Sequence, residues 1–147
     1  MKHRYVFPLL AVGLVALAPL RARAQGWQPP SKQMPEMPAR AELQGGAAGW
    51  AGAWLGSQAG AAGVGADQVR AVGEGARGPK AAFVRFTSGV FPVATWSDRN
   101  GDGRADMIEV FRDGARIVQL IDPDYDGTAN VMRVYSASGE LLREERM

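Results

Sequence analysis

Two short aspartate-rich stretches contain the residues of this chain that are best suited to chemistry. In each stretch oxygen-bearing side chains recur at alternate positions, and a glycine, Gly103 or Gly127, stands at the sixth position. We expect the first stretch to bind a metal ion through Asp98, Asn100, Asp102, the carbonyl of Arg104 and Asp106. We expect the second stretch to bind one through Asp122, Asp124, Asp126, the carbonyl of Thr128 and Asn130.

The ligand type and spacing in both stretches favour Ca²⁺. Calcium takes about six to eight oxygen ligands from carboxylates, amides, backbone carbonyls and water. Alternating ligands wrap a tight loop around one centre, and glycine at the sixth position permits the sharp turn because it tolerates positive φ. Carboxylates held this close repel one another, and a divalent cation removes that cost. The alternative is a pair of ordinary turns in which Asp and Asn side chains bond the local backbone.

The spacing resembles that of known calcium loops. From Asp98 to Glu109 the pattern Asp-x-Asn-x-Asp-Gly-x-x-Asp-x-x-Glu matches the EF-hand loop. The shorter Asp-x-Asp-x-Asp-Gly form resembles loops in the FG-GAP repeats of integrin-type propellers, in thrombospondin type 3 repeats and in Asp-Gly-rich repeats of bacterial envelope proteins. The resemblance spans roughly residues 83–143. In all of these families the loops bind calcium, so the resemblance implies the same here.

The flanks of the loops favour strands over the helices of an EF-hand. The run before Asp98 is strand-like and contains Pro92, and the twelfth residue of the second stretch is Arg133, which cannot ligate a cation. We therefore expect a strand–loop–strand unit, in which Glu109 is an ordinary strand residue. An EF-hand with helical flanks is the alternative.

A repeat of 24 residues connects the two stretches, because residues 105–111 align with residues 129–135. Each unit consists of a strand, a glycine turn, a second strand and an aspartate loop. The strands are expected at about residues 82–87, 90–96, 106–112, 115–121, 130–136 and 140–145. Connections this short favour an antiparallel meander. The predicted fold class is therefore mainly β, with about three hairpin repeats over residues 81–147.

Three segments of different composition precede the repeat domain. Residues 1–24 have the pattern of a secretory signal peptide, with basic residues, an apolar run over residues 6–20 and a cleavage site at Ala24. An uncleaved anchor is the alternative. Residues 25–40 form a Pro-rich linker that we expect to be disordered. Residues 41–80 are low in complexity and rich in Gly and Ala, and we expect a disordered or partly helical arm.

A small-residue pattern within this arm gives a second functional hypothesis. Gly52, Gly56 and Gly60 stand four residues apart, and no charged residue occurs from Gln44 to Ala66. The spacing is typical of a glycine zipper, in which small residues let two helices approach closely. Residues 44–66 would then serve membrane association or oligomerisation. A flexible spacer is the alternative, because glycine in a helix interior costs about 1 kcal/mol relative to alanine.

Composition excludes several classes of function. The chain has no Cys, and its only His is His3, within the predicted signal peptide, so thiolate and imidazole catalysis are not expected. Four of the 17 basic residues and none of the 15 acidic ones lie in that segment, which leaves 13 basic and 15 acidic residues. The basic isoelectric point therefore gives no reason to expect nucleic-acid binding.

We therefore expect an exported protein, in the periplasm, at the cell surface or outside the cell, whose loops bind Ca²⁺. Its role would be structural or adhesive and not enzymatic. The expected partners are calcium ions and a protein or cell-envelope component. The alternative is an envelope-associated protein that uses residues 44–66 for membrane contact or self-association.

Overall fold

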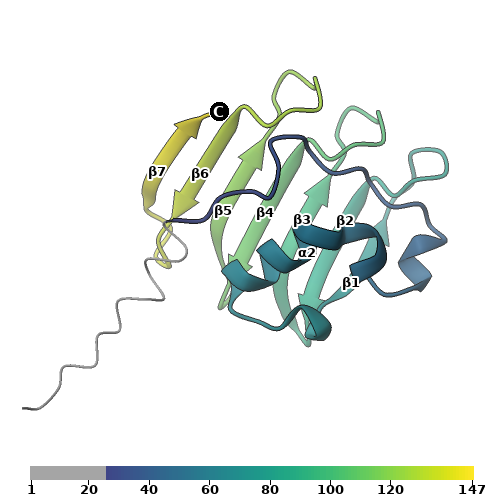
Figure 1. Ribbon diagram of the computed structural model, residues 1–147, viewed down its shortest axis with the longest axis horizontal. Helices are drawn as coiled ribbons and strands as arrows, with labels where there is room; N and C mark the ends of the chain where they lie inside the picture. The colour runs from purple at the N-terminus through teal and green to yellow at the C-terminus, as the bar shows by residue number, and fades with distance from the viewer. Residues whose placement is uncertain (1–25) are drawn as a thin grey trace, which may run out of the picture.

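The computed structural model describes residues 26–147, and the predicted signal peptide lies outside them. Seven strands form one antiparallel sheet in which every strand pairs with its neighbours in the chain (Figure 1). They are β1 (Arg70–Glu74), β2 (Phe83–Ser88), β3 (Phe91–Ser97), β4 (Met107–Arg112), β5 (Ala115–Ile121), β6 (Val131–Tyr135) and β7 (Leu141–Arg146). The helical elements are η1 (Glu42–Gln44), α2 (Ala48–Ala62) and η2 (Ala66–Gln68). The prediction of a mainly β antiparallel meander is confirmed.

The 24-residue repeat extends to the irregularities of the sheet. The register shifts between Phe86 and Thr87, again between Val110 and Phe111, and again between Val134 and Tyr135. Each shift lies just before a glycine turn. Because a bulge bends a strand and increases its twist, the three hairpins bend at equivalent positions.

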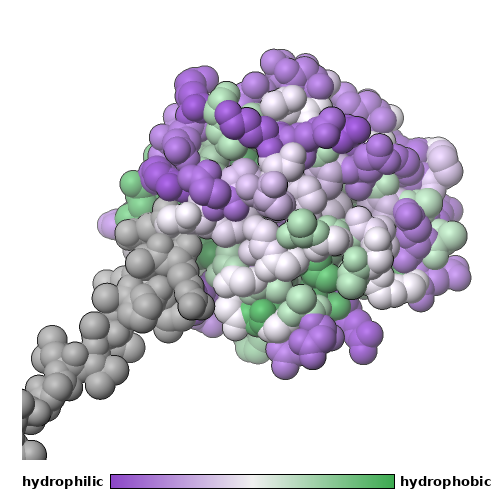
Figure 2. All heavy atoms as spheres, in the orientation of Figure 1, coloured by the Kyte–Doolittle hydropathy of each residue, from purple (hydrophilic) through white to green (hydrophobic). Residues whose placement is uncertain are grey.

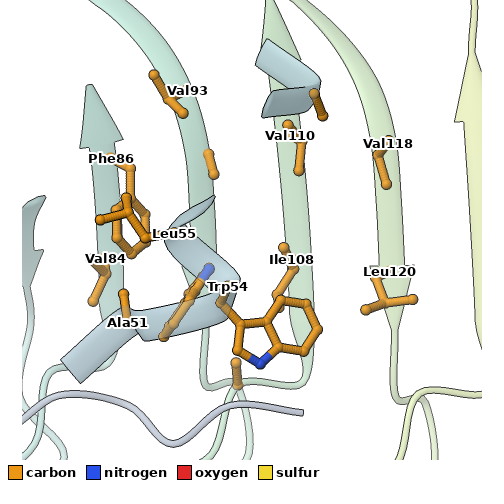
Figure 3. Close-up of a cluster of buried hydrophobic side chains, with 14 of the residues drawn as sticks. Ala51, Trp54, Leu55, Val84, Phe86, Val93, Ile108, Val110, Val118 and Leu120 are labelled. Atoms are coloured by element: carbon orange, nitrogen blue, oxygen red, sulfur yellow. The ribbon is translucent and has the colours of Figure 1, made fainter. Parts of the chain in front are cut away.

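The helix α2 covers one face of the sheet (Figure 1). Figure 3 shows Trp54 and Leu55 of α2 lying over inward side chains of the sheet, among them Val84, Phe86 and Ile108. Burying apolar side chains on both sides of this interface stabilises the two-layer arrangement. The opposite face of the sheet carries ion pairs instead, for example Arg133 with Glu144 at 2.7 Å. Only one face of the sheet is therefore covered within residues 26–147.

The outer side of α2 consists of glycine and alanine. Of the predicted glycine zipper, Gly56 and Gly60 are exposed with open space beside them, but Gly52 has φ of 49° and ψ of −125° and interrupts the helix. Gly49 is also exposed. Figure 2 shows neutral and weakly hydrophobic surface over this region and hydrophilic residues gathered along the loop end of the sheet. Within residues 26–147 no helix is both long and apolar enough to cross a membrane. The partly helical part of the arm thus packs on the sheet instead of standing apart from it.

The N-terminal segment corrects the expectation of a disordered linker at residues 25–40. Residues 27–40, called the strap below, run across the end of the sheet where the aspartate loops lie (Figure 1). The strap buries Trp27, Met34 and Met37 in the hydrophobic core. Met34 and Met37 are 0 % and 2 % exposed, so the strap is an integral part of the fold.

Three equivalent pairs of backbone hydrogen bonds hold the strap. Met34 donates to Gly127 and Lys32 accepts from Ala129. The same two bonds recur three residues later in the strap and 24 residues earlier in the sheet. They join Met37 to Gly103 and Pro35 to Ala105, and then Arg40 to Pro79 and Pro38 to Ala81. The connection between β1 and β2 is therefore a third copy of the loop frame, without the aspartates.

The strap matches the loops because three residues of extended chain and two strands of the sheet span nearly the same distance. Extended proline-type chain advances about 3.1 Å per residue, so three residues span about 9.3 Å. Neighbouring strands lie about 4.8 Å apart, so equivalent points two strands apart are separated by about 9.6 Å. Pro35 and Pro38 fix their own φ and hold the preceding methionines in extended conformations. These two prolines, three residues apart, therefore present one methionine to the core at each of the two aspartate loops.

We predict that Met37→Ala lowers the free energy of unfolding by about 2–5 kcal/mol, because it leaves a cavity beneath the strap. Urea denaturation monitored by circular dichroism measures this change. Gln33→Ala is the matched control, since Gln33 lies on the same strap with an exposed side chain. Equal stability of the two variants would contradict the buried position of the strap.

Candidate metal centre

Both aspartate stretches form loops between strands at the strap end of the sheet. The first loop, residues 98–106, joins β3 to β4, and the second loop, residues 122–130, joins β5 to β6. Strands on both sides rule out the alternative of an EF-hand with helical flanks. Glu109 lies within β4 and its carboxylate is paired with Arg116 at 2.8 Å. It therefore has the strand role that the flanks predicted.

In the first loop the carboxylate of Asp98 closes the backbone turn. Asp98 is 2 % exposed, its Oδ1 accepts from the Gly101 amide at 2.7 Å, and its Oδ2 accepts from the Gly103 amide at 2.9 Å. Gly101 and Gly103 adopt φ of 79° and 85°, which favours glycine at both positions. Asn100 and Asp102 are exposed and bond each other and the local backbone.

The other buried acid of the first loop, Asp106, is held by Arg99. Its Oδ2 accepts from the Arg99 amide at 2.6 Å, and its Oδ1 accepts from the Arg99 guanidinium at 2.8 Å. The bond to Asp106 raises the pKa of Arg99 above its usual value. All four carboxylate oxygens of Asp98 and Asp106 thus accept hydrogen bonds from the protein. Arg99, which the sequence did not single out as a site residue, supplies the positive charge that pairs with Asp106.

The second loop brings three carboxylates together. One oxygen from each of Asp122, Asp124 and Asp126 lies within 4.8 Å of the other two. Asp122 is 1 % exposed, and its Oδ2 accepts from the Gly127 amide at 2.8 Å. Its Oδ1 is buried and accepts no hydrogen bond, and the Oδ1 of Asn130 is in the same state. These two oxygens are free acceptors on two of the predicted ligands.

The electrostatics of the second loop favour a cation. Burial raises the pKa of Asp122, and the nearby carboxyl groups of Asp124 and Asp126 raise it further. The position that holds Arg99 in the first loop is Pro123 here, 24 residues later, so this loop supplies no positive charge at that position. A divalent ion among the three carboxylates would replace their mutual repulsion by attraction.

The strap contacts Arg104 and Thr128, the two residues whose carbonyls are predicted ligands. The backbone of Arg104 forms an isolated antiparallel β-bridge with Glu36 of the strap. The Nη1 of Arg104 also donates a hydrogen bond to the carbonyl of Met34 at 2.6 Å. Thr128 forms the equivalent bridge with Gln33. The structure thus gathers Asp122, Asp124 and Asp126 into one cluster. Among the described residues, the acids of the first loop form no such cluster.

One backbone conformation in the second loop is strained. Tyr125 adopts φ of 61°, at the position where the first loop has Gly101. Bulky residues rarely adopt this conformation, and such outliers gather at ligand sites and turns. The Arg99 guanidinium lies 5.9 Å from the centre of the Tyr125 ring, so the two loops touch.

No protein-family model, no curated protein and no solved structure matches this chain. The assignment of the centre therefore depends on the geometry of its own residues. Calcium binding by either loop remains a prediction.

We predict that without metal the stability of the wild-type protein relative to Asp122→Asn falls as the pH rises. The pKa of Asp122 is raised in the folded state. Its contribution is therefore fully present below the unfolded pKa of about 3.9 and is lost as the pH passes through the folded value. Urea denaturation of both proteins in chelator, from about pH 3 to pH 7, measures the difference. Parallel stability profiles would contradict the crowding of carboxylates in this loop.

Proposed function

We propose that this protein is an exported calcium-binding β-domain with a structural or adhesive role and no catalytic activity. The second loop would hold the ion. The observation that carries the proposal is the Oδ1 of Asp122, which is buried and accepts no hydrogen bond, beside two further carboxylates. Leaving a buried acceptor unpaired is costly, and a bound cation removes that cost.

The donor set suits calcium better than softer metals. The predicted ligands are carboxylate, amide and carbonyl oxygens, which suit Ca²⁺, Mg²⁺ and Mn²⁺, whereas zinc and copper sites use His and Cys. Neither His nor Cys occurs in residues 26–147. Calcium accepts irregular oxygen shells, while magnesium requires a nearly octahedral one and keeps several waters. A loop that offers three carboxylates together with amide and carbonyl oxygens supports the larger ion.

A bound ion would stiffen the end of the sheet. The second loop contacts the strap through the Met34 amide, which donates to Gly127, and through Lys32, which accepts from Ala129. These bonds begin one residue beyond Asp126. Because an ion that binds only the folded state stabilises it by mass action, calcium would stabilise the loop and the strap together.

A binding role is supported over an enzymatic one by the position of the acids. Asp124 and Asp126 are exposed on a loop at the rim of the sheet. A groove beside β1 is lined by Arg40, Leu43, Val72 and neighbouring small residues, and none of its lining residues is a carboxylate or a nucleophile. No acid–base pair faces an enclosed space at either place.

The envelope-associated alternative has one supporting observation. The outer side of α2 exposes only glycine and small side chains, with open space beside Gly56 and Gly60, so another helix could approach it closely. Pelleting of the protein with lipid vesicles, or self-association in sedimentation, would favour this alternative over a monomeric calcium-binding domain.

We predict that the protein binds Ca²⁺ with release or uptake of heat in isothermal titration calorimetry, and that Asp124→Asn and Asp126→Asn each abolish or strongly weaken this binding. Asp113→Asn is the matched control, because it removes one negative charge from an exposed turn at the other end of the sheet. At calcium 100-fold above Kd the free energy of unfolding should rise by about 2.7 kcal/mol. An unchanged melting temperature at millimolar calcium would refute the proposal.

A further inference from the structure

We infer that Arg99 is the built-in cation of the first loop, so that this loop takes no metal ion and the protein binds one calcium ion instead of the two that the repeated motif predicts. The inference rests on the proposed function for the calcium site in the second loop. It adds a residue that determines which loop can bind metal.

Arg99 occupies both carboxylate oxygens of Asp106, one of the two buried acids of the first loop. Its amide and its Nε lie 2.6 Å and 2.8 Å from the two oxygens of Asp106, and the amide of Asn100 adds a third bond at 3.3 Å. Asp106 is only 3 % exposed in its side chain, while Arg99 is 46 % exposed. Hydrogen bonds between charged groups are shorter and stronger than neutral ones. The guanidinium is also in contact range of Tyr125, which limits its alternative positions.

The second loop has neither the arginine nor the aspartate of this ion pair. Pro123 replaces Arg99 and offers neither a positive charge nor an amide hydrogen. Asn130 replaces Asp106, and Asp124 replaces Asn100, so one carboxylate has moved from the ninth position of the loop to the third. The moved carboxylate belongs to the converging cluster with Asp122 and Asp126.

The two loops would therefore respond differently to calcium. Backbone amides hold acids in both loops, but an ion entering the first loop must in addition separate Arg99 from Asp106. An ion entering the second loop meets the free Oδ1 of Asp122 and breaks no ion pair within the described residues. Arg99 and an ion are alternative neutralising charges for the same carboxylates, so removing Arg99 should make the first loop a binding site.

The test is the number of calcium ions bound per chain in isothermal titration calorimetry with CaCl₂. We expect one ion for the wild type, two for Arg99→Ala, and one again for Arg99→Ala combined with Asp102→Asn. Arg99→Lys keeps the positive charge and should remain at one. Arg85→Ala is the matched control, since it removes an exposed guanidinium paired with Glu74 outside the loops. It should also remain at one.

Several outcomes separate the inference from the proposed function. Two ions on the wild type, or one ion on both the wild type and folded Arg99→Ala, would overturn the inference and leave calcium binding intact. No ion on the wild type with one on Arg99→Ala would support the inference and overturn the assignment of the second loop. No ion on either protein would overturn both. Circular dichroism checks folding, and if Arg99→Ala does not fold, Arg99→Gln carries the same test with the same expected numbers.

Discussion

Backbone hydrogen bonds between the strap and three successive loops organise one whole end of this molecule. They form because three residues of extended chain and two strands of a sheet cover nearly the same distance, about 9.3 Å and 9.6 Å. The three-residue spacing of the strap's contacts and the 24-residue repeat of the sheet are therefore mutually dependent. A change in the length of one repeat unit would move its loop out of register with its strap residue. The aspartate loops inherit their positions from this frame.

The frame allows neighbouring loops to differ in chemistry without differing in shape. The backbone bonds at Gly103 and Gly127 are equivalent, and Ala105 and Ala129 are both buried beneath the strap. Above this common base the first loop pairs Asp106 with Arg99, whereas the second brings three carboxylates close to one another. The strap holds the backbone of both loops in the same way, while their side chains carry different charges.

Much of the fold was predictable because the repeat is local. Aromatic residues before glycine turns, aspartates at alternate positions and Pro92 before the first loop identify the hairpins, the loops and their strand flanks. The strap was not predictable, because its composition resembles that of disordered linkers and its partners lie far along the chain. The strand β1 was missed because Arg-Ala-Val-Gly-Glu has little strand propensity and depends on pairing with β2. The role of Arg99 depends on side-chain geometry, although its position beside Asp98 was visible in the sequence.

The strap also determines the order in which the chain can complete its fold. Arg104 reaches the carbonyl of Met34 across 70 residues, and Arg143 reaches the carbonyl of Trp27 across 116. During synthesis the strap emerges before its partners, so its methionines have no core to enter until the sheet and its aspartate loops are made. Contacts this distant in sequence form late, after the local hairpins, because closing a long loop costs entropy before it gains contacts. The first described segment to be synthesised is thus among the last to find its place.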